Sequence, residues 1–202
     1  EEQALRVVID ANVFLDLDER AAHHEESRSL LADWLSEFVE LHLTEEILTE
    51  INRSESSAER DRQRARVDTF PRVPREVGRE EEVFAKVRPL LPDDGRPSTE
   101  SDARQLAMTI AAGVTFFVTR DGIVLDVADH LYEMFALRVV SPVELILHFD
   151  GLRREEEYRP KRIFLGPDVR AIRPRAEDLE RLADLFHQGQ VLRHPRLTLL
   201  AP

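Results

Sequence analysis

The stretch VVIDANVFLDL, residues 7–17, determines how the rest of the chain is interpreted. Its first three residues, Val7 to Ile9, are a short apolar run, which predicts a buried strand of a parallel sheet. Asp10 follows directly, so its carboxylate is expected at the carboxyl end of that strand. In open α/β sheets this edge is where ligands bind. The stretch therefore predicts an α/β fold with an acid at its functional edge, and other residues must complete a site.

The composition excludes several classes of protein. The chain has 202 residues and no cysteine, which rules out structural disulfides, thiolate metal sites and a cysteine nucleophile. No apolar run approaches the roughly 20 residues of a membrane span, and no secretory signal precedes the first strand. Because the chain begins with Glu1 rather than Met, part of the natural start can be missing. We expect a cytoplasmic protein with one sizeable domain and room for an appendage.

The charge is strongly negative and unevenly distributed. The formal net charge is -12, which argues against broad nonspecific binding to nucleic acid. Residues 151–202 hold 11 basic and 8 acidic side chains, which leaves 17 basic and 32 acidic ones in residues 1–150. Such a surplus is usually a solvated face of the domain. The alternative is that some carboxylates converge and need a cation in order to coexist.

Strand and helix patterns alternate along the chain. Further strands are predicted at 39–43, 114–119 and 137–140. Helices are predicted at 25–41, 44–51, 54–68, 80–91, 103–112, 123–135 and 141–149, with Thr44 as an N-cap and Asp102 in a first turn. This alternation implies a parallel sheet with helices on both faces, which is a three-layer α/β fold.

Three further acids are candidates to join Asp10. Asp121 follows the apolar strand at 114–119 just as Asp10 follows the first strand, while Glu50 and Asp102 lie on predicted helices. If the two strands are neighbours, Asp10 and Asp121 lie close together, and unneutralised carboxylates at that range raise each other's pKa. A cluster of acids without a lysine partner predicts a hard divalent cation, Mg²⁺ or Mn²⁺ rather than Zn²⁺. Such a site can activate water for phosphodiester hydrolysis.

The blocks that carry these acids occur in a familiar order. They are VVIDANVFLDL, LTEEILTEI, SDARQLAMTIAAG and FFVTRDGIVL, and a closing strand and helix follow in LRVVSPVELI. From Arg6 to Phe149 the chain resembles a PIN domain, the fold of the VapC-type toxin ribonucleases and related metal-dependent nucleases. The resemblance implies catalytic and metal-binding roles for four residues, Asp10, Glu50, Asp102 and Asp121.

The resemblance also implies roles for neighbouring residues. Asn12 and Thr119 would orient the carboxylates by hydrogen bonding. Glu50 would complete the cluster or position the attacking water. Glu46 is the alternative for this position. We favour Glu50 because it precedes the apolar Ile51, and the glutamate of the family also precedes an apolar residue. Asp126 is a further acid one turn after Asp121, and an exposed position is the simpler expectation for it. Whether one or two ions bind stays open.

The activity implied by the resemblance is hydrolysis of RNA by an endoribonuclease, leaving a 5′-phosphate and a 3′-hydroxyl. A toxin-like role would bring an antitoxin-like protein partner as a separate chain, and a homodimer is a further expectation. The sequence does not indicate which RNA is cleaved, because it contains no stacking platform and no base-reading motif.

Two regions depart from a compact toxin. Residues 54–96 are long and rich in charge, and Arg60, Arg62, Arg64 and Arg66 alternate with other residues there. A solubilising face is the simpler interpretation of this run, and a phosphate-binding patch is the alternative. The region could also form the wall of an RNA groove or an oligomer contact.

We expect a nuclease domain at 1–149, a charged linker at 150–162 and a C-terminal extension at 163–202.

The extension contains a second resemblance. VRAIRPRAEDLERLADLF, residues 169–186, is similar to the opening strand and helix of a GNAT acetyltransferase domain. The chain lacks the glycine-rich loop that binds the acetyl-CoA pyrophosphate in that family, so it is not expected to be an acetyltransferase as it stands. A terminal strand and helix that cover an apolar patch would explain the stretch equally well.

Two other functions compete with the ribonuclease. The first is a non-catalytic PIN-fold module that binds RNA or a protein and regulates an attached acetyltransferase. The second is a metal-dependent phosphatase on another α/β fold. The commonest signature of such phosphatases has a second Asp two residues after the first, where this chain has Asn12. The phosphatase is therefore the least favoured of the three.

Overall fold

A computed structural model describes residues 4–18 and 24–157 of the chain. Its centre is a sheet of four parallel strands, β1 (Leu5–Ile9), β2 (Val39–His42), β3 (Phe116–Val118) and β4 (Arg138–Val140), in the order β2-β1-β3-β4. Ile9 at the end of β1 is paired with Val118 at the end of β3. The expected neighbouring strands therefore end side by side, and the residues after them meet at one edge of the sheet.

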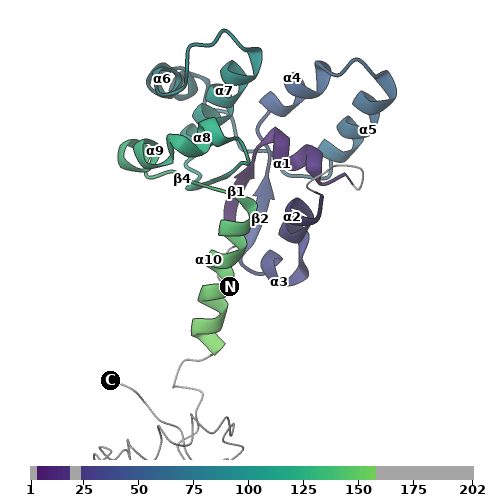
Figure 1. Cartoon of the computed structure of the whole chain (residues 1–202), viewed down its shortest axis with the longest axis vertical. Helices are drawn as coiled ribbons and strands as arrows, with labels where there is room; N and C mark the ends of the chain where they lie inside the picture. The colour runs from purple at the N-terminus through teal and green to yellow at the C-terminus, as the bar shows by residue number, and fades with distance from the viewer. Residues whose placement is uncertain (1–3, 19–23, 158–202) are drawn as a thin grey trace, which may run out of the picture. The chain divides into compact units, whose positions relative to one another are not determined.

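Helices cover both faces of the sheet (Figure 1). The helices, including two 3-10 turns labelled η, are α1 (Ala11–Asp16), α2 (His24–Arg28), η1 (Ser29–Leu31), α3 (Asp33–Ser36), α4 (Glu46–Asn52), α5 (Ser57–Val67), α6 (Val77–Val87), η2 (Arg88–Leu90), α7 (Pro97–Ala111), α8 (Gly122–Asp126), α9 (Ala128–Phe135) and α10 (Pro142–Glu157). The predicted three-layer α/β fold is confirmed.

The core has two halves because successive strand residues face opposite sides of the sheet. Val7 and Ile9 pack with α1, α3, α4, α5 and α10 in one cluster. Val8 packs with α6, α7, α8 and α9 in the other. Both faces of β1 are thus buried, which explains why its sequence is continuously apolar rather than alternating.

The first predicted helix is wrong in its continuity. Residues 25–41 form α2, η1 and α3 followed by β2, and Ala32 between η1 and α3 is extended, with ψ of 134°. The break turns the chain so that Leu30 and Leu35 are both buried, while Leu31 is 46 % exposed. Helical spacing alone did not reveal this turn, because the packing of Leu30 and Leu35 overrides local propensity.

Other boundaries differ from the prediction as well. Thr44 is not the N-cap of α4; Glu45 holds that position, and Thr44 is buried with its hydroxyl 3.4 Å from Gln105 Oε1. Helix α7 begins at Pro97, so Asp102 lies beyond its first turn. Proline is well suited to a first helical position because the missing N–H has no partner there anyway. The predicted helix at 123–135 is divided at Val127 into α8 and α9.

The last described helix is longer than predicted. Helix α10 continues past Phe149 to Glu157, into the sequence expected to be a charged linker. The rest of that linker and the GNAT-like stretch lie outside the described residues. Within the described residues, no helix has the combination of length and apolar character needed to cross a membrane.

Candidate metal centre

Asp10 is held firmly at the end of β1. It is the N-cap of α1, and only 2 % of it is exposed. Its Oδ1 accepts hydrogen bonds from Ala11 N at 2.6 Å and from Gln105 Nε2 at 2.9 Å. Its Oδ2 accepts from Asn12 Nδ2 and Thr119 Oγ1, both at 2.6 Å. Donors on both oxygens fix the orientation of this carboxylate.

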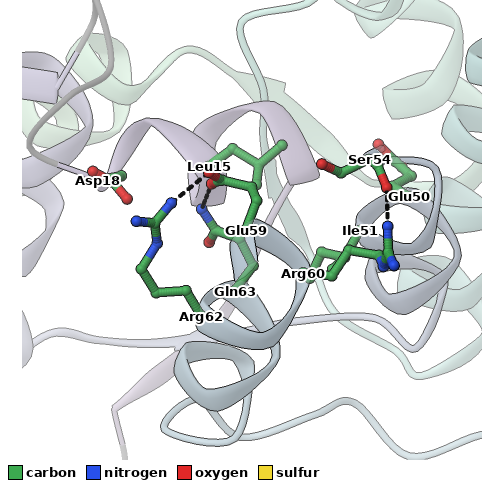
Figure 2. A pocket seen from close by; sticks show the side chains of 9 residues that line it. All are labelled: Leu15, Asp18, Glu50, Ile51, Ser54, Glu59, Arg60, Arg62 and Gln63. Atoms are coloured by element: carbon green, nitrogen blue, oxygen red, sulfur yellow. Dashed lines mark hydrogen bonds and ion pairs between the residues drawn. The ribbon is translucent and has the colours of Figure 1, made fainter. Parts of the chain in front are cut away.

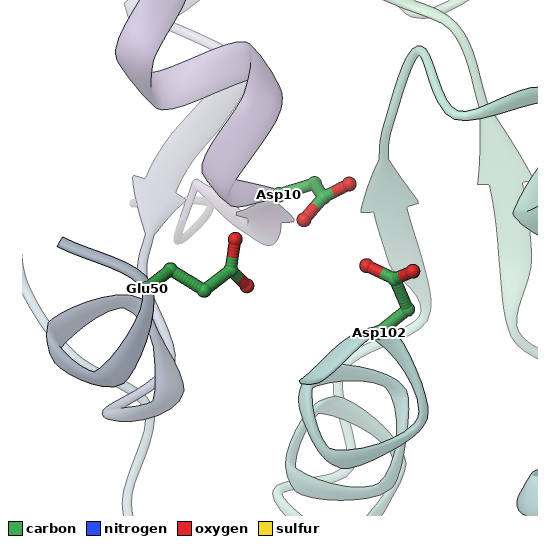
Figure 3. Close-up of side chains that lie close together, drawn as sticks. All are labelled: Asp10, Glu50 and Asp102. Carbon is green, nitrogen blue, oxygen red and sulfur yellow. The ribbon is translucent and has the colours of Figure 1, made fainter. Parts of the chain in front are cut away.

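Two helices bring further carboxylates to Asp10. Glu50 comes from α4 and Asp102 from α7, and both side chains are partly buried. One oxygen from each of the three carboxylates lies within 4.8 Å of the other two. Figure 3 shows the three side chains pointing toward one another across a common space. Three of the four predicted acids therefore converge at the carboxyl edge of the sheet.

These carboxylates are poorly compensated, and their pKa values rise as a result. Burial, aided by the charge of Asp121 and opposed by hydrogen bonds from Thr119, Ala11 and Gln105, raises the pKa of Asp10 to about 6. Burial and the charges of Asp10 and Asp102 raise the pKa of Glu50 to about 8. Burial and the charges of Asp10 and Asp121 raise the pKa of Asp102 to about 7. Without a cation, the cluster holds protons near neutral pH.

Asp121 stands beside this cluster rather than within it. It is the N-cap of α8, and its Oδ1 accepts a hydrogen bond from Ile123 N at 2.7 Å. Its negative charge nevertheless raises the pKa of Asp10 and of Asp102. The position after β3 thus brings Asp121 within electrostatic range of the three carboxylates, although its oxygens are not among the three that converge.

Asn12 and Thr119 link the two strand ends. Thr119 is fully buried, donates to Asp10 and accepts from the backbone N–H of Asp121 at 3.0 Å. Asn12 Nδ2 also contacts Thr119 Oγ1 at 3.1 Å, and Asn12 Oδ1 accepts from Arg120 N at 3.2 Å. These bonds join the turn after β1 to the turn after β3, as expected of residues that orient carboxylates.

Glu46 takes a different direction from Glu50. It is 8 % exposed, and its Oε1 accepts a hydrogen bond from Ser101 Oγ at 2.7 Å. Ser101 in turn accepts from Arg53 Nη2 at 2.8 Å. Of the two glutamates weighed for this helix, the structure brings Glu50 to Asp10 and Asp102, and it uses Glu46 to bind α7. Asp126 is not among the convergent carboxylates either.

Sequence reasoning missed Gln105, which bridges two of the acids. Its Nε2 donates to Asp10 Oδ1 and also to Glu50 Oε1, at 2.6 Å in the second case, and the residue is fully buried. Gln105 lies three residues after Asp102 on α7, so the two share one face of the helix. That spacing is the signal that could have identified it.

The donor set fits a hard divalent cation. All the convergent atoms are carboxylate oxygens, which suit Mg²⁺ or Mn²⁺. The pKa values raised by burial and mutual repulsion indicate uncompensated negative charge, which a divalent cation would neutralise. The candidate metal-binding residues are therefore Asp10, Glu50 and Asp102, with Asp121 nearby.

A cavity opens on one side of the cluster. It has a volume of about 320 Å³ and lies between α1, α4 and α5, with Glu50 in its lining (Figure 2). Leu15 and Ile51 supply apolar surface, and Arg60 and Arg62 come from the charge-rich region expected to form a groove wall or an oligomer contact. The first helix of that region thus adjoins the candidate metal centre.

Comparison with known proteins agrees with this architecture. The PIN domain family profile matches residues 6–122, more than half of the chain. The match stops short of β4 and α10, which the sequence resemblance had included. A search of the curated proteins finds no match.

Several solved structures are similar to the chain. VapBC2 from Rickettsia felis, bound to a promoter DNA fragment, is 11 % identical with a TM-score of 0.47, covering 68 % of this chain and 98 % of its own. FitAcB from Neisseria gonorrhoeae is 14 % identical with a TM-score of 0.43, and the match covers 67 % of this chain and 97 % of the FitAcB chain. VapBC-5 from Mycobacterium tuberculosis, of the VapBC toxin-antitoxin family, is 15 % identical with a TM-score of 0.42. The match covers 67 % of this chain and 98 % of the VapBC-5 chain.

Proposed function

The chain belongs to the PIN domain family, and on that premise we propose that it is an endoribonuclease dependent on Mg²⁺ or Mn²⁺. The observation that carries the proposal is the convergence of Asp10, Glu50 and Asp102, whose pKa values are all raised. Without a cation, burial and mutual repulsion keep part of this cluster protonated near neutral pH. A divalent cation would release those protons and supply a charge that binds a phosphodiester and activates water.

The residues of the chain would divide the work. Asp10, Glu50 and Asp102 would hold the ion, with Asp121 contributing directly or through water. Asn12, Thr119 and Gln105 would keep these carboxylates in place by hydrogen bonding, as they do for Asp10 here.

The reaction proposed is hydrolysis within an RNA strand. A water oxygen attacks the phosphorus, the bond from phosphorus to the 3′ oxygen breaks, and the products carry a 5′-phosphate and a 3′-hydroxyl. Glu50 is the best candidate to orient the attacking water, because it combines partial exposure with a position in the lining of the cavity. The cavity offers space beside the carboxylates for the substrate strand.

The first test is calorimetric titration with Mn²⁺ or Mg²⁺ on the wild type and on Asp102→Asn. Among the described residues Asp102 makes no side-chain hydrogen bond, so this variant removes one charge without disturbing the network around Asp10. We expect binding in the wild type and a large loss in Asp102→Asn. The control is Asp129→Asn on α9, whose acid lies outside the converging group. Absence of binding in the wild type would sink the metal-nuclease mechanism.

Cleavage assays decide between catalysis and a regulatory binding module. Wild type with Mg²⁺ or Mn²⁺ should cut single-stranded or structured RNA, and Asp102→Asn should not. If the wild type binds metal and RNA but never cleaves, the chain is a binding module instead. A toxin-like role predicts that bacterial growth stops on expression of the wild type and continues with Asp102→Asn.

A further inference from the structure

More than half of the arginines in residues 4–18 and 24–157 form ion pairs with carboxylates. Examples are Arg72 with Asp68, Arg79 with Glu76 and Arg154 with Asp150. In such pairs the arginine charge is largely cancelled locally. An arginine whose partner is a neutral oxygen instead keeps its full positive charge for another anion.

Three arginines near the candidate metal centre have neutral partners. Arg53 Nη2 donates to Ser101 Oγ at 2.8 Å, and Arg60 Nη1 donates to the carbonyl oxygen of Ser54 at 2.5 Å. Arg64 Nη2 donates to the side-chain oxygen of Asn52. Among the ion pairs found in residues 4–18 and 24–157, none includes any of these three arginines. We refer to Arg53, Arg60 and Arg64 as the α4–α5 arginine cluster.

The cluster is built around one short segment. Arg64 contacts residue 52, Arg53 is the next residue, and Arg60 contacts residue 54. This segment ends α4 one turn after Glu50, and Arg53 is the C-cap of the helix. Because Arg60 and Arg64 are four residues apart on α5, they share the face of that helix that meets α4.

The cluster adjoins the acids as well. Arg53 follows Glu50 by three residues, and it donates to Ser101, the residue directly before Asp102. Arg60, Ser54 and Glu50 line the same cavity, and Figure 2 shows Arg60 extended along it to Ser54. Arginines that form no ion pair within the described residues therefore lie beside the candidate metal centre.

A helix C-terminus attracts cations through its partial negative charge. Arg53 lies in this segment and donates to Ser101, while Arg60 and Arg64 reach residues 54 and 52 from α5, so three guanidinium groups gather around one short segment. An RNA strand approaching this protein meets a chain of net charge -12, so it needs a local positive surface. We infer that the α4–α5 arginine cluster binds backbone phosphates of the RNA strand beside the candidate metal centre.

This inference rests on the proposed function, and salt-dependent binding tests it separately from cleavage. A fluorescent single-stranded RNA is titrated with protein in EDTA between about 50 and 200 mM salt, and each phosphate contact contributes about 0.7 to the slope of log K against log salt. The triple variant Arg53→Gln, Arg60→Gln, Arg64→Gln should lower that slope by about 2. The triple lysine variant should keep it, because the charge remains.

A matched control separates the cluster from net charge. The triple variant Arg72→Gln, Arg79→Gln, Arg154→Gln removes the same charge from carboxylate-paired arginines and should leave the slope almost unchanged. Equal losses in the two glutamine variants, or no loss in either, would overturn the inference, as would wild-type protein that binds no RNA. Thermal melting of all variants confirms that they are folded.

The two proposals can fail independently. If the wild type cleaves RNA but the cluster variant keeps its salt slope, the ribonuclease stands and the inference fails. If the glutamine variant of the cluster has a smaller salt slope but the wild type never cleaves RNA, the α4–α5 arginine cluster binds RNA phosphates and the proposed ribonuclease activity is wrong.

Discussion

Two regions of this molecule bury carboxylates and treat them in opposite ways. Glu80 on α6 is 6 % exposed, and its carboxylate accepts hydrogen bonds from Arg75 Nη2 at 2.7 Å and from Glu76 N at 2.9 Å. The bonds from Arg75 outweigh burial and lower the pKa of Glu80. Asp10 is 2 % exposed and accepts four hydrogen bonds, yet burial raises its pKa to about 6.

The difference lies in the charge of the donors. Arg75 brings a full positive charge to Glu80 and also reaches Glu45 at 3.2 Å. Asp10 receives only neutral donors, which orient a carboxylate but offset its desolvation incompletely. The charge of Arg53 lowers the pKa of Glu50 and of Asp102, yet both pKa values stay raised, and within the described residues no arginine bonds to the three acids. That contrast is why the cluster could bind an external cation.

The largest expected effect comes from removing Asp10. A metal ion at such a site supplies several kcal/mol of transition-state stabilisation, so Asp10→Ala should reduce RNA cleavage by about 10³-fold. Initial rates with Mg²⁺ or Mn²⁺ measure it. Glu80→Ala, a buried acid on α6, should change stability instead and keep cleavage per folded molecule. Comparable rate losses in the two variants would erase the distinction between the regions.

Gln105→Leu removes a neutral hydrogen-bond donor from the cluster and changes no charge, so it tests what neutral donors contribute to the acids. It leaves Asp10 and Glu50 without their shared hydrogen-bond donor. Loss of such a supporting contact should weaken metal affinity by about 10- to 100-fold, measured by Mn²⁺ calorimetry. The control is Gln63→Leu, which removes another buried glutamine, bonded to Glu59 on α5. An affinity unchanged by Gln105→Leu would mean that the bridge does not position the acids.

Arg75→Met makes the region around Glu80 resemble the region around Asp10, because it removes the charged donor. Glu80 would stay buried without its guanidinium, so the free energy of unfolding should fall by about 1–3 kcal/mol and the pKa of Glu80 should rise. Urea denaturation measures the stability change, and metal affinity should stay as in the wild type. If stability is unchanged, the pairing of Arg75 with Glu80 is not what makes that buried acid tolerable.

The comparison also predicts how stability depends on pH. The pKa values of Asp10, Glu50 and Asp102 are raised to about 6, 8 and 7 in the folded protein. The folded state therefore binds more protons than the unfolded chain between about pH 4 and pH 8, so metal-free stability should fall as pH rises through that range. Melting temperatures measured across the range in EDTA check the sign.

Asp102→Asn provides the matched variant for this pH series. It removes one of the three raised pKa values and lowers the repulsion that raises the pKa of Glu50. The decline in melting temperature with pH should therefore be shallower than in the wild type. Mg²⁺ or Mn²⁺ should raise the melting temperature of the wild type but not that of Asp102→Asn. A steeper decline would show that the carboxylates do not repel each other as the structure indicates.

Local sequence patterns were sufficient for the sheet and for two of the acids. An apolar run followed by an acid predicts both a buried strand and a carboxylate at its end, so neighbouring residues alone are enough to locate Asp10 and Asp121. The parallel arrangement then fixes their common edge. The helix predicted at 25–41 failed because a turn at Ala32 depends on what Leu30 and Leu35 pack against, which helical spacing does not contain.

The amino-acid sequence by itself determined the layer order, the acid-bearing strand ends and the expectation of a divalent cation. Only the tertiary structure decided that Glu50 rather than Glu46 meets Asp10, that Gln105 bridges them, and which arginines keep their charge. The physical reason is the range of the interactions. Strand-end positions follow from neighbouring residues, whereas one helical turn of about 5.4 Å separates Glu46 from Glu50. Which of them faces Asp10 depends on how α4 packs against α7.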